Sequence, residues 1–495
     1  MGLSSVGFFV FLPVVAALYL HLPHKIQPGF LLAASWVFYL LAMPAMFVVL
    51  LGITAASYCI ARGLESAHRA AWLHGGVVCL LAVLAFFKYG PALNAAWDLG
   101  LPDIAFPLGI SFYTFAVISY LVDASRGDCP VEKNFIIHAL FLSFFPTVTS
   151  GPICRAGDLM PQLAAEHRFD QGRTIAALRL YALGTFKAIV VGKTLSVLVQ
   201  QVFPNYHDYG GWMLILGAVA YTFYLYFDFS GYSDSARAAA LMMGISLPEN
   251  FKTPFFATNF SGFWNRWHIS FSSWLQDYLF MPLAWADVSP LTRGRRDRLP
   301  VWICLLCVFL VSGFWHGNTL PFVLWGLLQA VYRIGEEVLH KRLGKPKKKA
   351  PARVLWGKRA VVFVLWTFSM VFFCVGSTGG MDIGDCFGYL AGCVQGLSPA
   401  RFAGELYSVI YDGFYPHVLM VAGYYLFVVL VLALAFRLDW YRSFSCKNRP
   451  SEQALAAMPR QRLICYLLVV CILIGLILES GGFGGGANFG AYAGF

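Results

Sequence analysis

Residues 301–331 read VWICLLCVFLVSGFWHGNTLPFVLWGLLQAV, and this stretch decides the class of fold. Two apolar runs, residues 301–311 and 320–331, flank a short polar segment that carries His316. Similar runs recur along the chain, and several approach the roughly 20 residues that a helix needs to cross a bilayer. They are residues 45–60, 77–87, 212–226, 361–375, 417–436 and 464–478. The pattern predicts a polytopic membrane protein with about eleven transmembrane helices.

The composition excludes a soluble globular domain. Of the 495 residues, 59% are hydrophobic and 12% are charged, against about 25% charged residues in soluble domains. Because the apolar runs are continuous and do not alternate with polar residues, they favour helices over the strands of a membrane barrel. The expected fold class is therefore all-α, with one membrane domain over residues 1–480.

Both ends of the chain have a distinct character. Residues 1–22 lack a basic segment and a small-residue cleavage site, so they are interpreted as a retained first helix and not as a signal peptide. Residues 481–495 are rich in glycine and aromatic residues. A flexible tail at the membrane surface is expected there, since no strand precedes the glycines and no helix follows them, as a phosphate-binding loop would require.

The net charge of +11 comes from clustered basic residues. The clusters are Arg293, Arg295, Arg296 and Arg298, residues 341–349, Arg353 with Lys358 and Arg359, and residues 437–462. Short basic loops between apolar spans mark the cytoplasmic side and favour anionic lipid headgroups, so nucleic acid is not an expected partner. The side of the N-terminus stays open, because residues 30–60 read either as one long helix or as a hairpin broken at Pro44.

The twelve cysteines are scattered and predict no disulfide framework. Cys304 and Cys307 have the spacing of a redox or zinc motif, but they lie within an apolar run and no second pair is nearby. They are expected to be small core residues. No metal site is predicted.

His316 is the first candidate for chemistry, because ionisable groups within membrane spans are costly and therefore often functional. Its glycine neighbours allow close approach, and Asn318 and Pro321 suggest a broken or re-entrant helix that lines a cavity. A neutral imidazole there can take a proton from a hydroxyl or a thiol as a general base. A histidine that only makes a hydrogen bond between helices is an equally good interpretation of the residues alone.

The second candidate is His268, within residues 263–278. If this segment is one helix, aromatic residues form one stripe and polar residues a second, whereas His268 falls on a third face with Asn265. An aromatic belt at the membrane interface explains the first two stripes but not the histidine.

The third candidate is the polar segment 226–234, with Asp228, Ser230 and Asp234, which follows an uncharged run. It is interpreted as a break that orients a histidine or a substrate, or equally as a capped helix boundary. A calcium loop is excluded because the ligand spacing and the final glutamate are missing. The signatures of serine hydrolases, P-loop proteins and zinc proteases are also missing from the sequence.

These segments together resemble a family. The residues that carry the resemblance are Phe87 to Tyr89, residues 107–115, Phe145-Pro146, residues 151–153 with Arg155, Pro161-Gln162, residues 226–234, 248–251 and 263–278, Trp315-His316-Gly317 and residues 322–326. Their order and spacing are similar to those of the membrane-bound O-acyltransferases, in particular the bacterial branch typified by alginate O-acetylation.

The resemblance implies a fold, a chemistry and a site. The fold would be a ring of about eleven tilted helices, some of them broken, around a central chamber. His316 would be catalytic, and His268 would face the same chamber. Further chamber candidates are Trp315, Asn318, Asn265, Asp228, Ser230, Asp234 and Arg155.

The resemblance also implies a division of labour. The protein would take acetyl groups from acetyl-CoA at the cytoplasmic face of a bacterial inner membrane and present them on the other side. A periplasmic or membrane-anchored acetyltransferase partner would then acetylate a polysaccharide such as alginate. Peptidoglycan as the acceptor, and a conduit or scaffold without catalysis, are the alternatives.

Overall fold

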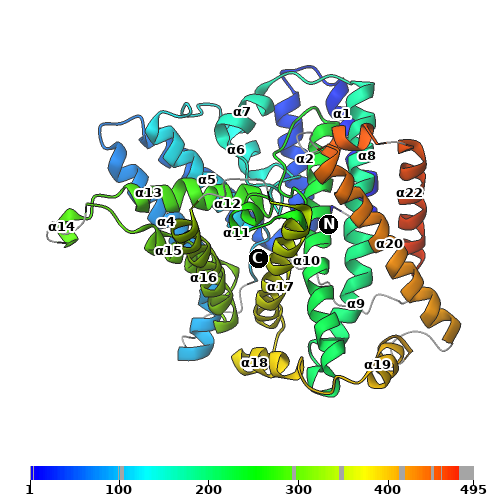
Figure 1. Ribbon diagram of the computed structural model, residues 1–495. Helices are drawn as coiled ribbons and strands as arrows, with labels where there is room; N and C mark the ends of the chain where they lie inside the picture. The colour runs from blue at the N-terminus through cyan, green and yellow to red at the C-terminus, as the bar shows by residue number, and fades with distance from the viewer. Residues whose placement is uncertain are drawn as a thin grey trace.

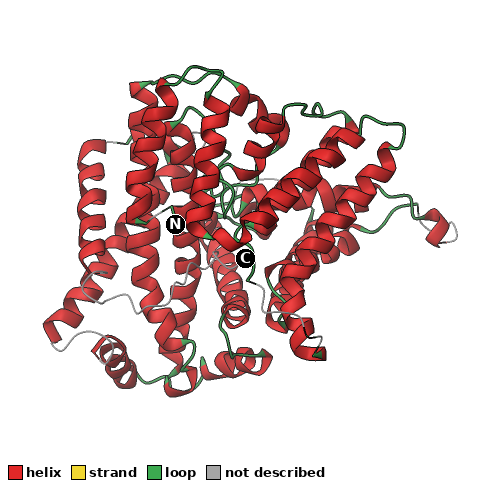
Figure 2. Ribbon diagram, turned by 180° about the vertical axis from the view of Figure 1, so that it is seen from behind, coloured by secondary structure: helices red, strands yellow, loops and turns green. Residues whose placement is uncertain are grey.

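The computed structural model describes residues 2–3, 5–98, 100, 105–292, 297–344, 350–411, 418–446, 451–458 and 460–478. Within these residues the protein consists of helices and loops, with no strand (Figure 2). The glycine-rich tail, Arg293, Arg295, Arg296 and part of the basic segment 341–349 lie outside the described residues.

The helices follow one another along the whole described chain. They are α1 (Val6–His21), α2 (Gln27–Ala42), η1 (Pro44–Met46), α3 (Phe47–Gly63), α4 (Arg69–Trp97), α5 (Ile110–Arg126), α6 (Phe135–Ser143), α7 (Ala156–Ala164), α8 (Gln171–Thr185), η2 (Phe186–Gly192), α9 (Lys193–Val202), η3 (Tyr206–Asp208), α10 (Gly211–Met242), η4 (Pro254–Phe256), α11 (Phe260–Trp264), α12 (Ile269–Leu275), η5 (Gln276–Phe280), α13 (Met281–Trp285), α14 (Ser289–Thr292), α15 (Val301–His316), α16 (Leu320–Leu343), α17 (Ala352–Ser377), α18 (Ile383–Gly392), α19 (Pro399–Tyr411), α20 (Val418–Phe444), α21 (Ser451–Ala456) and α22 (Gln461–Leu478).

Six of the described helices are long and apolar enough to cross a membrane. They cover Pro44–Gly63, Arg69–Asn94, Gln171–Val202, Gly211–Met242, Ala352–Ser377 and Val421–Phe444. Shorter apolar helices cover Gly7–His21, Gln27–Ala42, Val301–His316 and Gln461–Gly475. The predicted class, an all-helical multi-pass membrane protein, is confirmed, while the number of about eleven spans stays a prediction.

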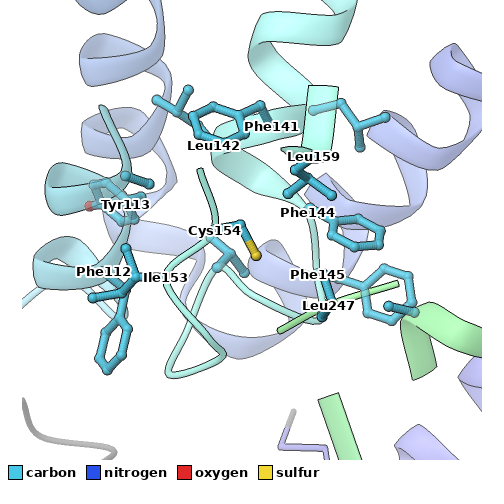
Figure 3. Close-up of a cluster of buried hydrophobic side chains, with 14 of the residues drawn as sticks. Phe112, Tyr113, Phe141, Leu142, Phe144, Phe145, Ile153, Cys154, Leu159 and Leu247 are labelled. Carbon is cyan, nitrogen blue, oxygen red and sulfur yellow. The ribbon is translucent and has the colours of Figure 1, made fainter. Parts of the chain in front are cut away.

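Helices α8, α9 and α17 stand side by side around α10, whereas α3 and α4 pack against each other and against α5. Helix α10 packs against α8, η2, α9 and α17, and Figure 1 shows α20 and α22 outside this group, with α18 and α19 across one end. A first apolar cluster joins the N-terminal helices to α12, and a second joins α9, α10, α17 and α20. Figure 3 shows part of the first cluster, where Phe112 of α5, Phe141 of α6 and Phe144 lie near the loop residue Ile153.

The helix is interrupted at Pro44, so residues 30–60 form two helices and not one long helix. Helix α2 ends at Ala42, the short η1 begins at Pro44, and α3 follows from Phe47. Proline has no N–H for the helical hydrogen bond and its ring clashes with the preceding turn, so the helix stops before it.

Residues 226–234 do not break a helix, and the expectation of a break or capped boundary there is wrong. They lie in the middle of the continuous helix α10. Gly231 serves close packing: a Cβ atom there would lie 2.6 Å from the carbonyl oxygen of Gly184 in α8. Asp234 is accommodated because Nζ of Lys187 lies 2.9 Å from its carboxylate, and buried charges persist when they are paired.

Residues 263–278 are not one helix, so the expected stripes are wrong as well. Helix α11 ends at Trp264, α12 starts at Ile269, and a π-helical turn, η5, follows. Between α11 and α12, His268 has the left-handed φ of 44°, which costs a residue other than glycine about 1–3 kcal/mol and is typical of functional sites.

Helix α16 runs antiparallel to both α15 and α17. Phe322 lies against Gly376, Nε2 of Gln329 donates to Oγ of Ser369 at 2.9 Å, and Tyr332 donates to the Leu365 carbonyl. The start of α15, the end of α16 and the start of α17 therefore share one end of the molecule. We call it the basic end, because Arg298, Lys341, Arg342, Arg353, Lys358 and Arg359 lie there.

Candidate active site

His316 is the last residue of α15, at the predicted interruption. Gly317 is extended, and α16 starts only at Leu320 and runs antiparallel to α15, so the expected interruption is a turn between two helices and not a break within one helix. A re-entrant path through the membrane stays a prediction. The two helices approach closely at Gly313, where a Cβ atom would lie 2.5 Å from the carbonyl oxygen of Phe322. The glycine thus fixes the position of the histidine one turn away.

A small cavity lies against the His316 ring. Its volume is about 10 Å³, roughly enough for one water molecule. The residues that line it are Leu225, Trp264, Trp267, His268, Phe271, His316, Trp325, Trp366, Met370 and Phe373. The structure therefore brings the two predicted histidines to one cavity, which we call the His316 chamber.

Aromatic rings enclose His316. The ring centroid of His316 lies 4.6 Å from that of Trp315, 4.8 Å from that of Phe373 and 5.0 Å from that of Trp325. His316 is only 5% exposed. Because water is largely kept out, electrostatic interactions with a reacting group would be strong in this chamber.

The orientation of His268 is set by Asn250. The Nδ1 atom of His268 lies 3.2 Å from Oδ1 of Asn250, and the same oxygen accepts the N–H and the O–H of Ser270 at 3.1 and 3.0 Å. A carboxamide oxygen only accepts hydrogen bonds, so Nδ1 carries the proton. In the neutral ring, Nε2 then holds the lone pair.

The other predicted chamber residues are dispersed. Trp315 packs against His316, Asn265 lines a separate, larger cavity, and Asn318 is exposed. Arg155 forms an ion pair with Asp277 at 2.8 Å. Neither Arg155 nor Asn318 lines the His316 chamber.

The three polar candidates of α10 also lie outside the His316 chamber, although they are buried or half-buried. Asp228 lies beside Gly192 of η2, Ser230 is inside the helix packing, and Asp234 pairs with Lys187. They were predicted to face the chamber with the histidines. The residues that they actually contact lie in distant segments of the chain, which the sequence alone does not reveal.

Asp234 belongs to a buried ion network next to the support of His268. Arg237 contacts Asp234 at 3.4 Å and Glu452 at 3.0 Å. Arg442 contacts Glu249 at 3.7 Å, and Glu249 precedes Asn250 in the chain. Arg237 also contacts Glu249, at 3.5 Å, so the network connects η2, α10, α20 and α21 to the residue that holds His268.

Two larger cavities flank the His316 chamber. The first measures about 340 Å³ and is lined by Ser261, Trp264, Asn265, Ile269, Ser272, Ser273, Leu275, Gln276, Phe280, Leu305, Val308, Phe309, Ser312 and Arg333. Trp264 also lines the chamber. Leu305 of α15 and Arg333 of α16 are closer to the basic end than His316 is. This cavity therefore faces the basic end.

The second flanking cavity measures about 270 Å³. It is lined by Ser196, Val199, Gln200, Phe203, Pro204, Tyr221, Tyr224, Cys374, Ser377 and Thr378. Phe373 lines the chamber and Cys374 lines this cavity, so the second cavity continues along α17 away from the basic end. Trp264 thus borders both the chamber and the first cavity, and Phe373 and Cys374 are neighbours in α17.

Sequence reasoning missed part of the chamber wall. Leu225, Trp366, Met370 and Phe373 lie in apolar helices that carry no local mark of function, whereas Trp325 and Asn250 belong to segments that contributed to the resemblance. Lys88 was noted only as part of that resemblance, and its ammonium lies 5.4 Å from the centre of a Trp315 ring.

The model of the MBOAT, membrane-bound O-acyltransferase, family matches residues 96–378, more than half of the chain, and the chain belongs to this family. The matched segment contains both histidines and every residue of the chamber wall. The protein is therefore an O-acyltransferase of the membrane.

Individual relatives are bacterial. The probable alginate O-acetylase AlgI of Pseudomonas syringae pv. tomato is 33% identical over 75% of this chain and 71% of its own length. The protein of the same description from Pseudomonas fluorescens is 31% identical over 92% of this chain and 85% of its own length. The peptidoglycan O-acetyltransferase of Helicobacter pylori is 31% identical over 61% of this chain and 62% of its own length.

Proposed function

We propose that this protein takes acetyl groups from acetyl-CoA at the cytoplasmic face of a bacterial inner membrane and passes them across for O-acetylation of an extracytoplasmic polysaccharide, such as alginate. The names of the Pseudomonas relatives support acetyl as the group and alginate as one acceptor. In this proposal the helices form a ring of about eleven tilted spans around the His316 chamber.

One observation carries the proposal: the His316 chamber lies between a cavity that faces the basic end and a cavity that faces away from it. Lys and Arg gather in the cytoplasmic loops of membrane proteins, so the basic end would face the cytoplasm. A donor thioester that enters through the first cavity and an acceptor that enters through the second would meet at His316.

The first cavity suits a polar donor. Serine, asparagine and glutamine side chains line it together with Arg333, and hydroxyls, amides and a guanidinium can bind the amide and phosphate groups of a coenzyme arm. The Arg333 side chain lies 3.2 Å from Glu336 and is 18% exposed.

His316 would act as the general base. It takes the proton from the acceptor hydroxyl as the oxygen attacks the acetyl carbonyl, and it returns that proton to the departing thiolate. His268, with its lone pair on Nε2 in the neutral ring, would face the same reacting groups and assist.

A partner protein completes the proposal. The acetyl group would pass to a periplasmic or membrane-anchored acetyltransferase, which acetylates the glycan. The Helicobacter relative supports peptidoglycan as an alternative acceptor. A conduit or scaffold without its own transfer step is the other alternative, and it requires the two histidines to be dispensable.

Replacement of His316 by alanine tests the proposal. Membranes with matched amounts of the parental protein, His316→Ala or His268→Ala, together with the partner, are supplied with labelled acetyl-CoA, and label in the extracytoplasmic polysaccharide and peptidoglycan fractions is counted. We expect His316→Ala to lower transfer at least 100-fold. His138→Ala is the matched control, since His138 is buried but bonds to Ser57, away from the chamber.

The outcomes separate the alternatives. Transfer by His316→Ala near the parental rate contradicts catalysis by this histidine and favours the conduit. Label in the peptidoglycan fraction alone contradicts the proposed polysaccharide acceptor but is consistent with the proposed acetyl transfer by this protein.

A further inference from the structure

Three indole N–H groups at the His316 chamber have no acceptor among the described residues. Trp264, Trp325 and Trp366 line the chamber, and no atom of the described residues accepts a hydrogen bond from their Nε1 atoms. Trp325 is 2% exposed and Trp366 is 0% exposed. Leaving a buried donor without an acceptor costs about 1–3 kcal/mol.

Two indoles elsewhere in the described residues have acceptors. Nε1 of Trp36 donates to Oγ of Ser143 at 3.1 Å, and Nε1 of Trp274 donates to the Phe115 carbonyl at 2.9 Å. Buried tryptophans usually find such a partner. Trp315, adjacent to His316 in the chain, also lacks an acceptor among the described residues but does not line the chamber.

The three chamber indoles form one group beside the histidine. The Trp264 ring lies 5.6 Å from that of Trp366 and 6.2 Å from that of Trp325. The Trp325 ring is perpendicular to His316, at 87° and 5.0 Å. The three indoles and the candidate base therefore border one cavity.

We infer that the indole N–H groups of Trp325, Trp366 and Trp264 form the oxyanion hole of this enzyme and take the carbonyl oxygen of the donor thioester as their acceptor. The inference rests on the proposed function. Preorganised donors in a chamber that excludes water stabilise developing negative charge far better than donors in water do.

During acetyl transfer, negative charge develops on the carbonyl oxygen of the thioester, and the indole donors act on this atom. The acceptor oxygen forms a bond to the carbonyl carbon while His316 takes its proton. The electron pair of the C=O π bond moves to the carbonyl oxygen, and the indoles donate to this alkoxide. When the alkoxide reforms the carbonyl, the C–S bond breaks, and the thiolate takes the proton from His316.

The test removes the N–H and keeps the ring. The full-length protein with its partner is assayed with labelled acetyl-CoA as Trp325→Phe, as Trp366→Phe, and with benzothienylalanine at position 325, which has sulfur in place of N–H and preserves the packing. We expect kcat to fall about 100-fold for the Trp325 replacements, with the KM for acetyl-CoA within about twofold.

A second substrate makes the readout specific. Acetyl-CoA with sulfur in place of the carbonyl oxygen offers a poor hydrogen-bond acceptor, so the parental enzyme should discriminate against it. Loss of this discrimination in both Trp325 variants supports the inference. Unchanged discrimination overturns it, even if the variants are slower.

Two controls complete the experiment. Trp274→Phe and Trp36→Phe each remove an indole N–H that has an acceptor, so they should lower stability and leave kcat and the discrimination unchanged. If the parental protein itself transfers no acetyl group, the proposed function fails. If it does and the Trp325 variants match it, only the oxyanion hole fails.

Discussion

The Nδ1–H of His268 donates to Oδ1 of Asn250 across 3.2 Å, and this contact places a strained histidine at the chamber of His316. The backbone reinforces it, because the N–H of Ile269 donates to the Asn250 carbonyl at 2.9 Å. Asn250 therefore holds both the ring and the left-handed turn, and its role is positional.

Replacement of Asn250 by leucine tests that role. The change removes the acceptor of His268 and Ser270, so His268 loses its orientation and acetyl transfer should fall roughly 10- to 100-fold, as for other residues that orient catalytic groups. In a His268→Ala background the same change should cost nothing further, because interacting residues are not additive. A full additional loss in that background would contradict the positional role.

The close contact of α15 and α16 gives a second prediction. Gly313→Ala places a Cβ atom 2.5 Å from the Phe322 carbonyl oxygen, so the helices must move apart, at a cost of about 1–3 kcal/mol. His316 lies one turn away and should shift, which lowers transfer. Thermal unfolding in detergent and the transfer assay measure the two effects.

Gly335 provides the matched control. It lies in the same helix as Phe322, but a Cβ atom there would meet nothing within 4 Å. Gly335→Ala should stabilise the helix by up to about 1 kcal/mol and leave transfer unchanged. Equal effects of the two alanines would show that helix contact does not position His316.

Composition and local breaks were predictable from the sequence. The scarcity of charge over long apolar runs leaves a helical membrane domain as the fold, and Pro44 and residues 317–319 mark real interruptions because proline and glycine act locally. His316 and His268 stood out because each is an ionisable group in an apolar context.

The partners of polar groups were not predictable. Asp234 looked like a break because its cation, Lys187, is 47 residues away, on another helix. The segment 263–278 has helical periodicity. However, His268 forms a hydrogen bond with Asn250, which lies 18 residues earlier in the chain, and His268 is not part of a helix. Trp366 and Met370 reach the chamber only through the antiparallel packing of α17.

The Lys187–Asp234 pair gives a third prediction. Both side chains are more than 90% buried, so Lys187→Met removes the cation nearest to the buried carboxylate, leaves it with the longer contact to Arg237, and should destabilise the protein by about 3 kcal/mol. Adding Asp234→Asn should restore much of the loss. The free energy of unfolding in detergent is the measurement.

An exposed pair serves as the control for this change. Lys341 lies 3.4 Å from Glu337, with side chains 68% and 36% exposed. Lys341→Met should change stability by less than about 1 kcal/mol. If the two methionine variants are equally stable, the buried network contributes nothing specific.

The wall of the His316 chamber gives the last prediction. Met370 is 1% exposed and lines the small chamber beside His316, so its side chain should limit the size of the acyl group. Met370→Ala enlarges this space and should raise transfer from propionyl-CoA relative to acetyl-CoA, about tenfold for one added methylene. Met213→Ala removes the same atoms from a buried site in α10 that does not line the chamber, and should keep the parental ratio. If both alanines shift the ratio equally, loss of packing sets it, whereas a shift in Met370→Ala alone assigns acyl selection to this wall.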